Sequence, residues 1–212
     1  MAPLKIPARL PIAAGPLPAA PLGAEVTLTS PSILGALFGG SELLLALSRR
    51  ASSGASADDR GSLQRLWIVI MLSLATAYAA VSVFPGAAFA SSPQAHAAGV
   101  GMFAAGLILR WYAIIYLGRL FTVNVAISEE HRVVASGPYR FIRHPSYSGA
   151  LLAFLGFAVC LGNIAALALI MVPVTWVFLH RIRIEEAVLA AALGENYRRY
   201  MSHTKRLIPG IY

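Results

Sequence analysis

A chain of 212 residues in which 58% are hydrophobic and only 12% are charged differs from a soluble domain, where charged residues make up about a quarter. We therefore expect an integral membrane protein. The net charge of +8 does not indicate nucleic-acid binding, because the basic residues stand beside apolar segments rather than forming a polar face. The single cysteine, Cys160, excludes a disulfide framework and a cysteine-based metal site.

The first thirty residues contain six prolines, which are incompatible with a stable helix. We expect residues 1–30 to form a disordered, proline-rich tail rather than a cleaved signal peptide. Residues 31–117 then predict three transmembrane helices. Their apolar segments are residues 31–48, 66–84 and 96–117. The first has 18 residues, and at about 1.5 Å per residue it reaches about 27 Å, enough to cross the hydrocarbon core.

Two charged residues lie inside these apolar segments, Glu42 in the first and Arg110 in the third. A charge at that depth is costly unless it is paired or faces a polar interior. Glu42 is therefore one candidate partner for Arg110.

Residues 118–212 are expected to form the second part of an all-α membrane protein. From Tyr147 to His180 the chain is uncharged and too long for one span, and Gly162-Asn163 is its best turn signal. We predict a helical hairpin of residues 147–161 and 164–180, which brings the number of spans to five.

The basic residues predict the orientation of these spans. Arg and Lys are frequent in the connectors after the first and third segments and after the hairpin, whereas the connector after the second segment has none. The positive-inside rule therefore predicts an external N-terminus and a cytoplasmic C-terminus. We expect Arg198, Arg199, Lys205 and Arg206 to contact lipid headgroups.

The segment from Gly137 to Gly149 is dense in proline, aromatic and basic residues. Pro138 and Pro145 restrict the backbone, so a rigid loop followed by a helix that begins near Ser146 is predicted. Composition alone is equally compatible with a basic juxtamembrane loop with an aromatic belt.

A second motif follows the hairpin. Arg181 and Glu185 would share one face of a helix, Glu186 would point elsewhere, and Gly194 would end that helix.

Together these motifs resemble the isoprenylcysteine carboxyl methyltransferase family. The resemblance rests on Gly-x-Tyr-x-x-x-Arg-His-Pro-x-Tyr-x-Gly, an apolar hairpin, Arg-x-x-x-Glu-Glu, Gly-x-x-Tyr-x-x-Tyr and a closing Ile-Pro. It covers about residues 119–212 and implies a membrane enzyme that uses S-adenosylmethionine and is related to phospholipid N-methyltransferases. Residues 118–212 would then be its catalytic core.

The resemblance implies residue roles as well. Arg181 would meet the substrate carboxylate, and Glu185 would contact the cofactor; these two are the expected catalytic residues. The other cofactor-binding residues that it implies are Asn124, His131, Arg132, Val133, Val134, Tyr139, His144, Pro145, Ser146 and Tyr147. A Rossmann-type site is excluded, because no glycine-rich strand-to-helix turn is present.

The expected reaction is carboxyl O-methylation of an isoprenylcysteine-like acceptor drawn from the bilayer. A carboxylate is already ionised at neutral pH and needs no general base. O-methylation of a phenolic lipid or N-methylation of a phospholipid remains an alternative, and there His144, Glu185 or Glu186 would be the base. From other classes, a sterol-type NADPH-dependent reductase and a non-catalytic scaffold remain. No metal is expected, because His96 and His203 have no other metal-ligating residues near them in the sequence.

Overall fold

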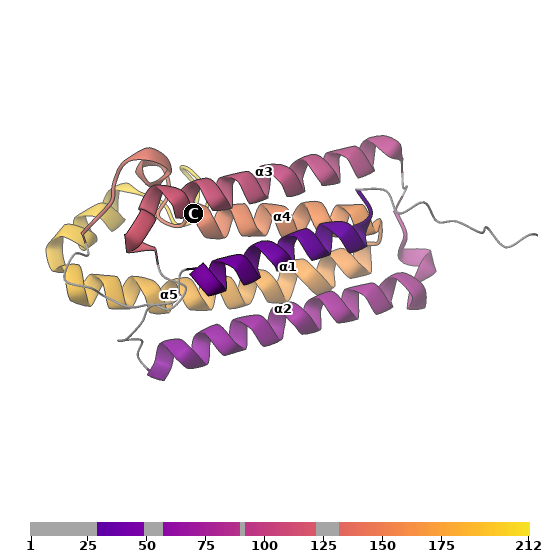
Figure 1. The fold of residues 1–212 in the computed structure, drawn as a ribbon, viewed down its shortest axis with the longest axis horizontal. Helices are drawn as coiled ribbons and strands as arrows, with labels where there is room; N and C mark the ends of the chain where they lie inside the picture. The colour runs from indigo at the N-terminus through magenta and orange to yellow at the C-terminus, as the bar shows by residue number, and fades with distance from the viewer. Residues whose placement is uncertain (1–28, 49–56, 90–91, 122–131) are drawn as a thin grey trace, which may run out of the picture.

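The computed structural model describes residues 29–48, 57–89, 92–121 and 132–212, and in them the chain is a bundle of five antiparallel helices (Figure 1). The helices are α1 (Pro31–Ser48), α2 (Ala57–Val83), α3 (Pro93–Leu117), α4 (Pro145–Leu161) and α5 (Ile164–His203). Short 3₁₀ turns cover Pro85–Ala87, Gly118–Leu120 and Gly137–Arg140. The described part contains two isolated β-bridges but no named strand. The all-helical prediction is confirmed.

Three of these helices, α2, α3 and α5, are long and apolar enough to cross a membrane, whereas α1 and α4 are shorter apolar helices. The predicted first segment, residues 31–48, matches α1. The sequence underestimated α2, which begins at Ala57. Helix continues beyond residue 180 in α5, as expected for the segment with Arg181 and Glu185, and reaches His203. The proline-rich tail falls almost wholly outside the described residues.

The hairpin turn lies where the sequence predicted it. Gly162 takes a left-handed conformation (φ 64°, ψ 24°) after α4, and Asn163 caps α5. The Asn163 side chain accepts hydrogen bonds from the N–H groups of Ala165 and Ala166, and its amide donates to the Phe84 carbonyl. This turn therefore also holds the end of α2 at the same end of the bundle.

Helices α3 and α4 are in backbone contact through glycine. A Cβ atom at Gly106 would lie 2.4 Å from the Ala153 nitrogen, and one at Gly149 would lie 2.5 Å from the Arg110 nitrogen. Small residues allow this approach in membrane helices. The contact fixes the level of Arg110 on α3 against the first turns of α4.

The predicted partner of Arg110 is confirmed. Its Nε and Nη2 donate to the two carboxylate oxygens of Glu42 at 2.6 and 2.7 Å, and its Nη1 donates to the Ser146 hydroxyl at 3.0 Å. One arginine therefore joins α1, α3 and α4.

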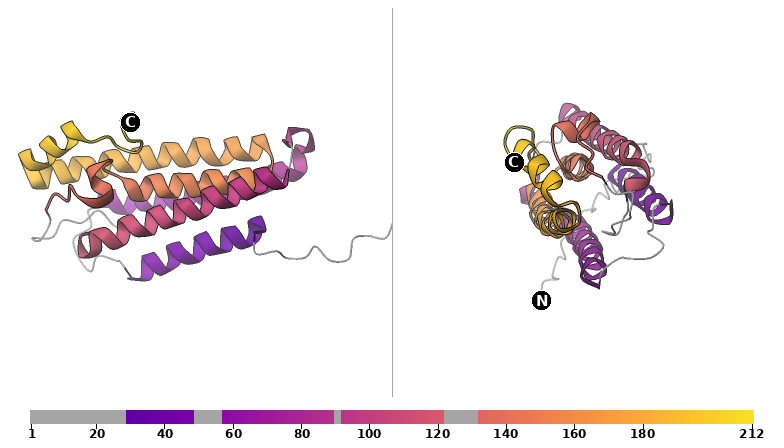
Figure 2. Two further views of the ribbon diagram at one scale, coloured as in Figure 1. Left: turned by 90° about the horizontal axis from the view of Figure 1, so that it is seen from above. Right: turned by 90° about the vertical axis from the view of Figure 1, so that its left-hand side faces the viewer.

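Beyond the bundle, α5 turns back on itself at Gly194 (φ 59°, ψ −134°), as the two views of Figure 2 show. Gly194 ends the helical segment that carries Arg181 and Glu185, as predicted, and a second helical segment follows the kink and continues to His203. The returning segment and the chain after it lie beside the Gly137–Arg140 turn and the start of α4.

Candidate active site

The loop from Gly137 to His144 is fixed to the end of α3. Gly137 has φ 55°, and a Cβ atom there would lie 2.4 Å from the Tyr116 ring, so glycine is required for both reasons. Tyr139 is buried and donates from its hydroxyl to the Ala113 carbonyl at 3.2 Å. Burial raises the pKa of the Tyr139 phenol, which keeps this donor protonated.

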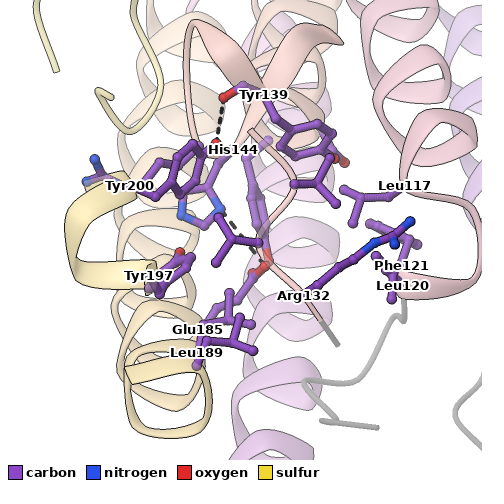
Figure 3. A pocket seen from close by; sticks show the side chains of 16 residues that line it. Leu117, Leu120, Phe121, Arg132, Tyr139, His144, Glu185, Leu189, Tyr197 and Tyr200 are labelled. Carbon is purple, nitrogen blue, oxygen red and sulfur yellow. Dashed lines mark hydrogen bonds and ion pairs between the residues drawn. The ribbon is translucent and has the colours of Figure 1, made fainter. Parts of the chain in front are cut away.

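The same loop is also held by the returning end of α5 and the chain that follows it. The Tyr200 hydroxyl donates to the Tyr139 carbonyl at 2.6 Å (Figure 3). Backbone N–H groups of Arg143 and His144 donate to the carbonyls of Lys205 and Arg206 at 2.8 and 3.0 Å. The C-terminal segment therefore forms part of the structure around the site.

Glu186 is the buried centre of this region. Its Oε1 accepts from Arg143 Nε at 2.8 Å and lies 3.2 Å from His144 Nε2, and its Oε2 accepts from Arg206 Nε at 2.9 Å. The Arg143 guanidinium also donates to the carbonyls of Met201 and Thr204. Since an ionised carboxylate only accepts, His144 carries its proton on Nε2.

This arrangement corrects the expectation that Arg206 contacts lipid headgroups. Its guanidinium pairs with Glu186, and that hydrogen bond raises the pKa of Arg206. Sequence patterns gave no signal for this pair, because the two residues are 20 positions apart and separated by the turn at Gly194. Glu185 and Glu186 approach different nitrogens of the His144 ring, Nδ1 and Nε2.

A pocket opens between this loop and α5. Figure 3 shows Tyr197, Tyr200, Glu185 and Leu189 on one side, the end of α3 with Leu117, Leu120 and Phe121 on the other, and His144 between them. Eight of the predicted cofactor-binding residues line it: Arg132, Val133, Val134, Tyr139, His144, Ser146, Tyr147 and Glu185.

Glu185 presents the acidic group of this first pocket. Its side chain is 28% exposed, and its Oε2 accepts from the Tyr147 hydroxyl at 3.1 Å. His144 Nδ1 lies 3.9 Å from its Oε1. Tyr147 thereby holds the carboxylate in place beside aromatic and aliphatic walls, an environment suited to a ligand that is both cationic and flat.

Of the other predicted cofactor-binding residues, one lies outside this pocket and two are not described by the structure. Pro145 is fully buried at the start of α4 and does not line the pocket; Asn124 and His131 fall outside the described residues. Sequence reasoning missed Leu117, Leu120, Phe121, Arg143, Leu189, Leu193, Tyr197 and Tyr200 as pocket residues. Tyr197 and Tyr200 had a signal, since both belong to the Gly-x-x-Tyr-x-x-Tyr motif.

Arg181 lines a second pocket, between α1, α2, α4 and α5. Its Nη1 donates to the Ser62 hydroxyl at 2.6 Å, and the side chain is buried. Most other lining residues are apolar, among them Phe38, Leu45, Leu66 and Phe178, and the Glu42–Arg110 ion pair lines the pocket as well. Phe121, Ser146 and Tyr147 line both pockets, so the two share one wall.

Comparison with known proteins identifies the family. A profile described as the isoprenylcysteine carboxyl methyltransferase (ICMT) family matches residues 99–191. "Protein-S-isoprenylcysteine O-methyltransferase A" of Arabidopsis thaliana is 30% identical over 171 residues, which are 80% of this chain and 86% of that protein. The chain belongs to the isoprenylcysteine carboxyl methyltransferase family.

Other relatives match over a shorter region. "Protein-S-isoprenylcysteine O-methyltransferase B" of Arabidopsis thaliana is 37% identical over 52% of this chain and 57% of its own length. "Protein-S-isoprenylcysteine O-methyltransferase" of Schizosaccharomyces pombe is 33% identical over 52% of the chain and 48% of its own length. The chain thus spans about half the length of these two family members.

A solved structure shares the fold. It is a eukaryotic intramembrane Ras methyltransferase, isoprenylcysteine carboxyl methyltransferase, which matches with a TM-score of 0.59 and 23% identity over 85% of this chain and 65% of that one. With three helices of membrane length among its described residues, the chain described here is an integral membrane protein. Among its described residues, no group of three His, Cys, Asp or Glu side chains could hold a metal ion.

Proposed function

We propose that this family member transfers a methyl group from S-adenosylmethionine to the carboxylate of an isoprenylcysteine-like lipid. The observation that carries the proposal is the shared wall of the two pockets. One pocket presents Glu185 among aromatic residues, the other presents Arg181 in a chamber whose lining is mostly apolar apart from the paired Glu42 and Arg110, and Tyr147 lines both. A cofactor and a lipid acceptor held on the two sides would meet at this wall.

The first pocket has the donor set that the cofactor requires. Glu185 offers a carboxylate to an ammonium group or to ribose hydroxyls, and Tyr139, Tyr147 and Tyr197 offer flat faces to an adenine or a cation. His144 would orient the polar end of the ligand, because Glu186 fixes its ring. When bound there, S-adenosylmethionine supplies an electrophilic methyl group.

The second pocket would hold the acceptor. Its apolar residues would surround a hydrocarbon chain, and the Arg181 guanidinium would bind a carboxylate by two parallel hydrogen bonds. A carboxylate is ionised at neutral pH, so no residue has to remove a proton. The main contribution of the protein would then be positioning, which accounts for large rate effects when two reactants are held in line.

The orientation in the membrane is part of the proposal. We infer that the end of the bundle that carries both pockets faces the cytoplasm, because its described residues include Arg65, Arg140, Arg143 and Arg206. The opposite end, with the turns at Pro85–Ala87 and Gly162-Asn163, has no Lys or Arg among its described residues. This orientation can be tested by placing single cysteines at either end of the bundle and labelling them in intact cells.

The experiment that tests the function is methyl transfer by the purified full chain in lipid nanodiscs. Methyl-labelled S-adenosylmethionine is incubated with N-acetyl-S-farnesylcysteine, a phenolic prenyl lipid or phosphatidylethanolamine. We expect base-labile label on the prenylcysteine, since methyl esters hydrolyse in base. Base-stable label on either other lipid would assign ether or amine formation instead. Thermal stabilisation by NADPH but not by S-adenosylmethionine would favour a reductase.

A further inference from the structure

The apolar chamber that holds Arg181 is continued towards the middle of the bundle by a smaller cavity. This inner cavity is lined by Gly35, Phe38, Leu74, Phe103, Phe154 and Phe157, together with Ala153. Phe38 lines the chamber and the inner cavity alike. Its ring therefore stands between the two spaces.

The ring of Phe38 is held in that place. It is 8% exposed, and its centroid lies 4.7 Å from that of Phe154, at an interplanar angle of 53°. Phe154 is followed by Phe178 at 6.3 Å and Phe178 by Tyr147 at 5.3 Å. A row of aromatic rings thus leads from the shared wall of the two pockets to Phe38.

The inner cavity adds depth without adding polar groups. On α4 the chamber reaches Ala150 and the inner cavity reaches Phe157, which is seven residues or about 10 Å further along the helix. None of the residues that line the inner cavity is charged or carries a polar side chain. On α1, Gly35 faces this space one turn before Phe38, and a Cβ atom there would lie 3.6 Å from the Phe157 ring.

We propose that Phe38 sets the length of the isoprenoid chain that the protein accepts. The inference rests on the proposed function, and it concerns which prenyl group is selected. With its head at Arg181, a short chain fills the chamber and stops at the Phe38 ring. A longer chain needs the inner cavity, and it reaches that cavity only when the ring gives way.

Two substitutions act in opposite directions on this barrier. Phe38→Ala joins the chamber to the inner cavity, whereas Gly35→Val fills the inner cavity from the same helix. Leu37→Ala is the matched control, because Leu37 lies between them in sequence but is 55% exposed on the outer face of the bundle. Phe38→Leu keeps an apolar side chain and serves as the milder variant if Phe38→Ala does not fold.

The test compares kcat/KM for N-acetyl-S-geranyl-, S-farnesyl- and S-geranylgeranylcysteine in full-length protein in nanodiscs. We expect Phe38→Ala to raise the geranylgeranyl-to-farnesyl ratio by about tenfold, the scale of one or two methylenes in an apolar pocket. Phe38→Leu should raise it less, Gly35→Val added to Phe38→Ala should reverse the gain, and Leu37→Ala should leave it unchanged.

The outcomes separate this inference from the proposed function. If wild-type protein methylates none of the three acceptors, the proposed function fails, and thermal stabilisation by the same three compounds still ranks their chain lengths. If wild type is active but the ratio is the same in both Phe38 variants, the chain leaves the chamber by another route and the inference is wrong.

Discussion

Glu42 on α1 and Arg110 on α3 form a two-point ion pair within the apolar part of the bundle, with N–O distances of 2.6 and 2.7 Å. Their side chains are 7% and 11% exposed. Breaking such a buried pair from one side leaves an uncompensated charge, which costs about 3–5 kcal/mol. We therefore expect Glu42→Ala to lower the free energy of unfolding by about 3 kcal/mol or more.

Denaturant titration of the protein in mixed micelles measures this loss. The control is Glu195→Ala, which removes the partner of Arg198 in an exposed pair with an N–O distance of 3.9 Å. Exposed pairs contribute little, so this variant should behave like wild type. Equal stability of the two variants would show that the Glu42–Arg110 pair is not a structural support.

The glycine contact between α3 and α4 predicts a second stability effect. Gly149→Ala places a Cβ atom 2.5 Å from the Arg110 nitrogen, so the two helices have to separate. We expect a loss of about 1–3 kcal/mol, the usual cost of overpacking. Gly101→Ala is the control, because a Cβ atom there meets nothing within 4 Å, and it should be neutral or slightly stabilising. Thermal unfolding in detergent compares the two, and equal melting temperatures would contradict the close contact.

Glu186 predicts a link between the C-terminal segment and the first pocket. Glu186→Gln removes the charge shared by Arg143, His144 and Arg206 while keeping the side-chain size. A hydrogen bond to a charged group contributes about 1.5–3 kcal/mol. Arg143 and His144 line the first pocket, so loosening their bonds to Glu186 should lower the affinity for S-adenosylmethionine at least about tenfold. Trypsin should also cleave faster after Lys205 and Arg206.

Glu185→Gln separates these two effects. Glu185 lines the pocket but makes no described contact with the C-terminal segment, so this variant should weaken cofactor binding and leave the trypsin pattern unchanged. Isothermal titration and timed proteolysis give the two measurements. Identical proteolysis of wild type and the Glu186 variant would show that Glu186 does not hold the segment.

Arg181 predicts a split between binding and turnover. Arg181 lines the second pocket and not the first. Arg181→Ala should therefore abolish methyl transfer but change the cofactor affinity by no more than about twofold, well below the tenfold that corresponds to 1.4 kcal/mol. Arg181→Lys keeps the charge but loses the two-point geometry, and we expect turnover to fall about a hundredfold. Full activity of Arg181→Ala would remove its role as the carboxylate partner.

Local patterns in the sequence were enough to predict much of the fold. Apolar segment lengths placed α1 and α3, and Gly162-Asn163 placed the hairpin turn, because each depends on residues adjacent in the chain. The pair between Glu42 and Arg110 followed from the cost of isolated charges in lipid. The five predicted spans stay a prediction, since three helices have membrane length.

The site was less accessible to the same reasoning. The motif supplied Tyr147 and Glu185, but the grouping of Arg143 and Arg206 around Glu186 depends on how α5 folds back at Gly194, which no local pattern encodes. Leu117 and Phe121 line the pocket because α3 ends beside it, and this too is a consequence of helix packing.

Arg181 and Glu185 stand one turn apart on α5, a single helix that continues from the hairpin turn at Asn163 up to the kink at Gly194. Their separation is therefore set by the helical repeat, about 6 Å along the axis, and not by a hinge or a loop. A thicker or thinner bilayer would tilt the bundle as a unit. The distance between these two residues, which we propose bind the acceptor and the cofactor, would stay constant, and the geometry of the proposed reaction would then be independent of the host membrane.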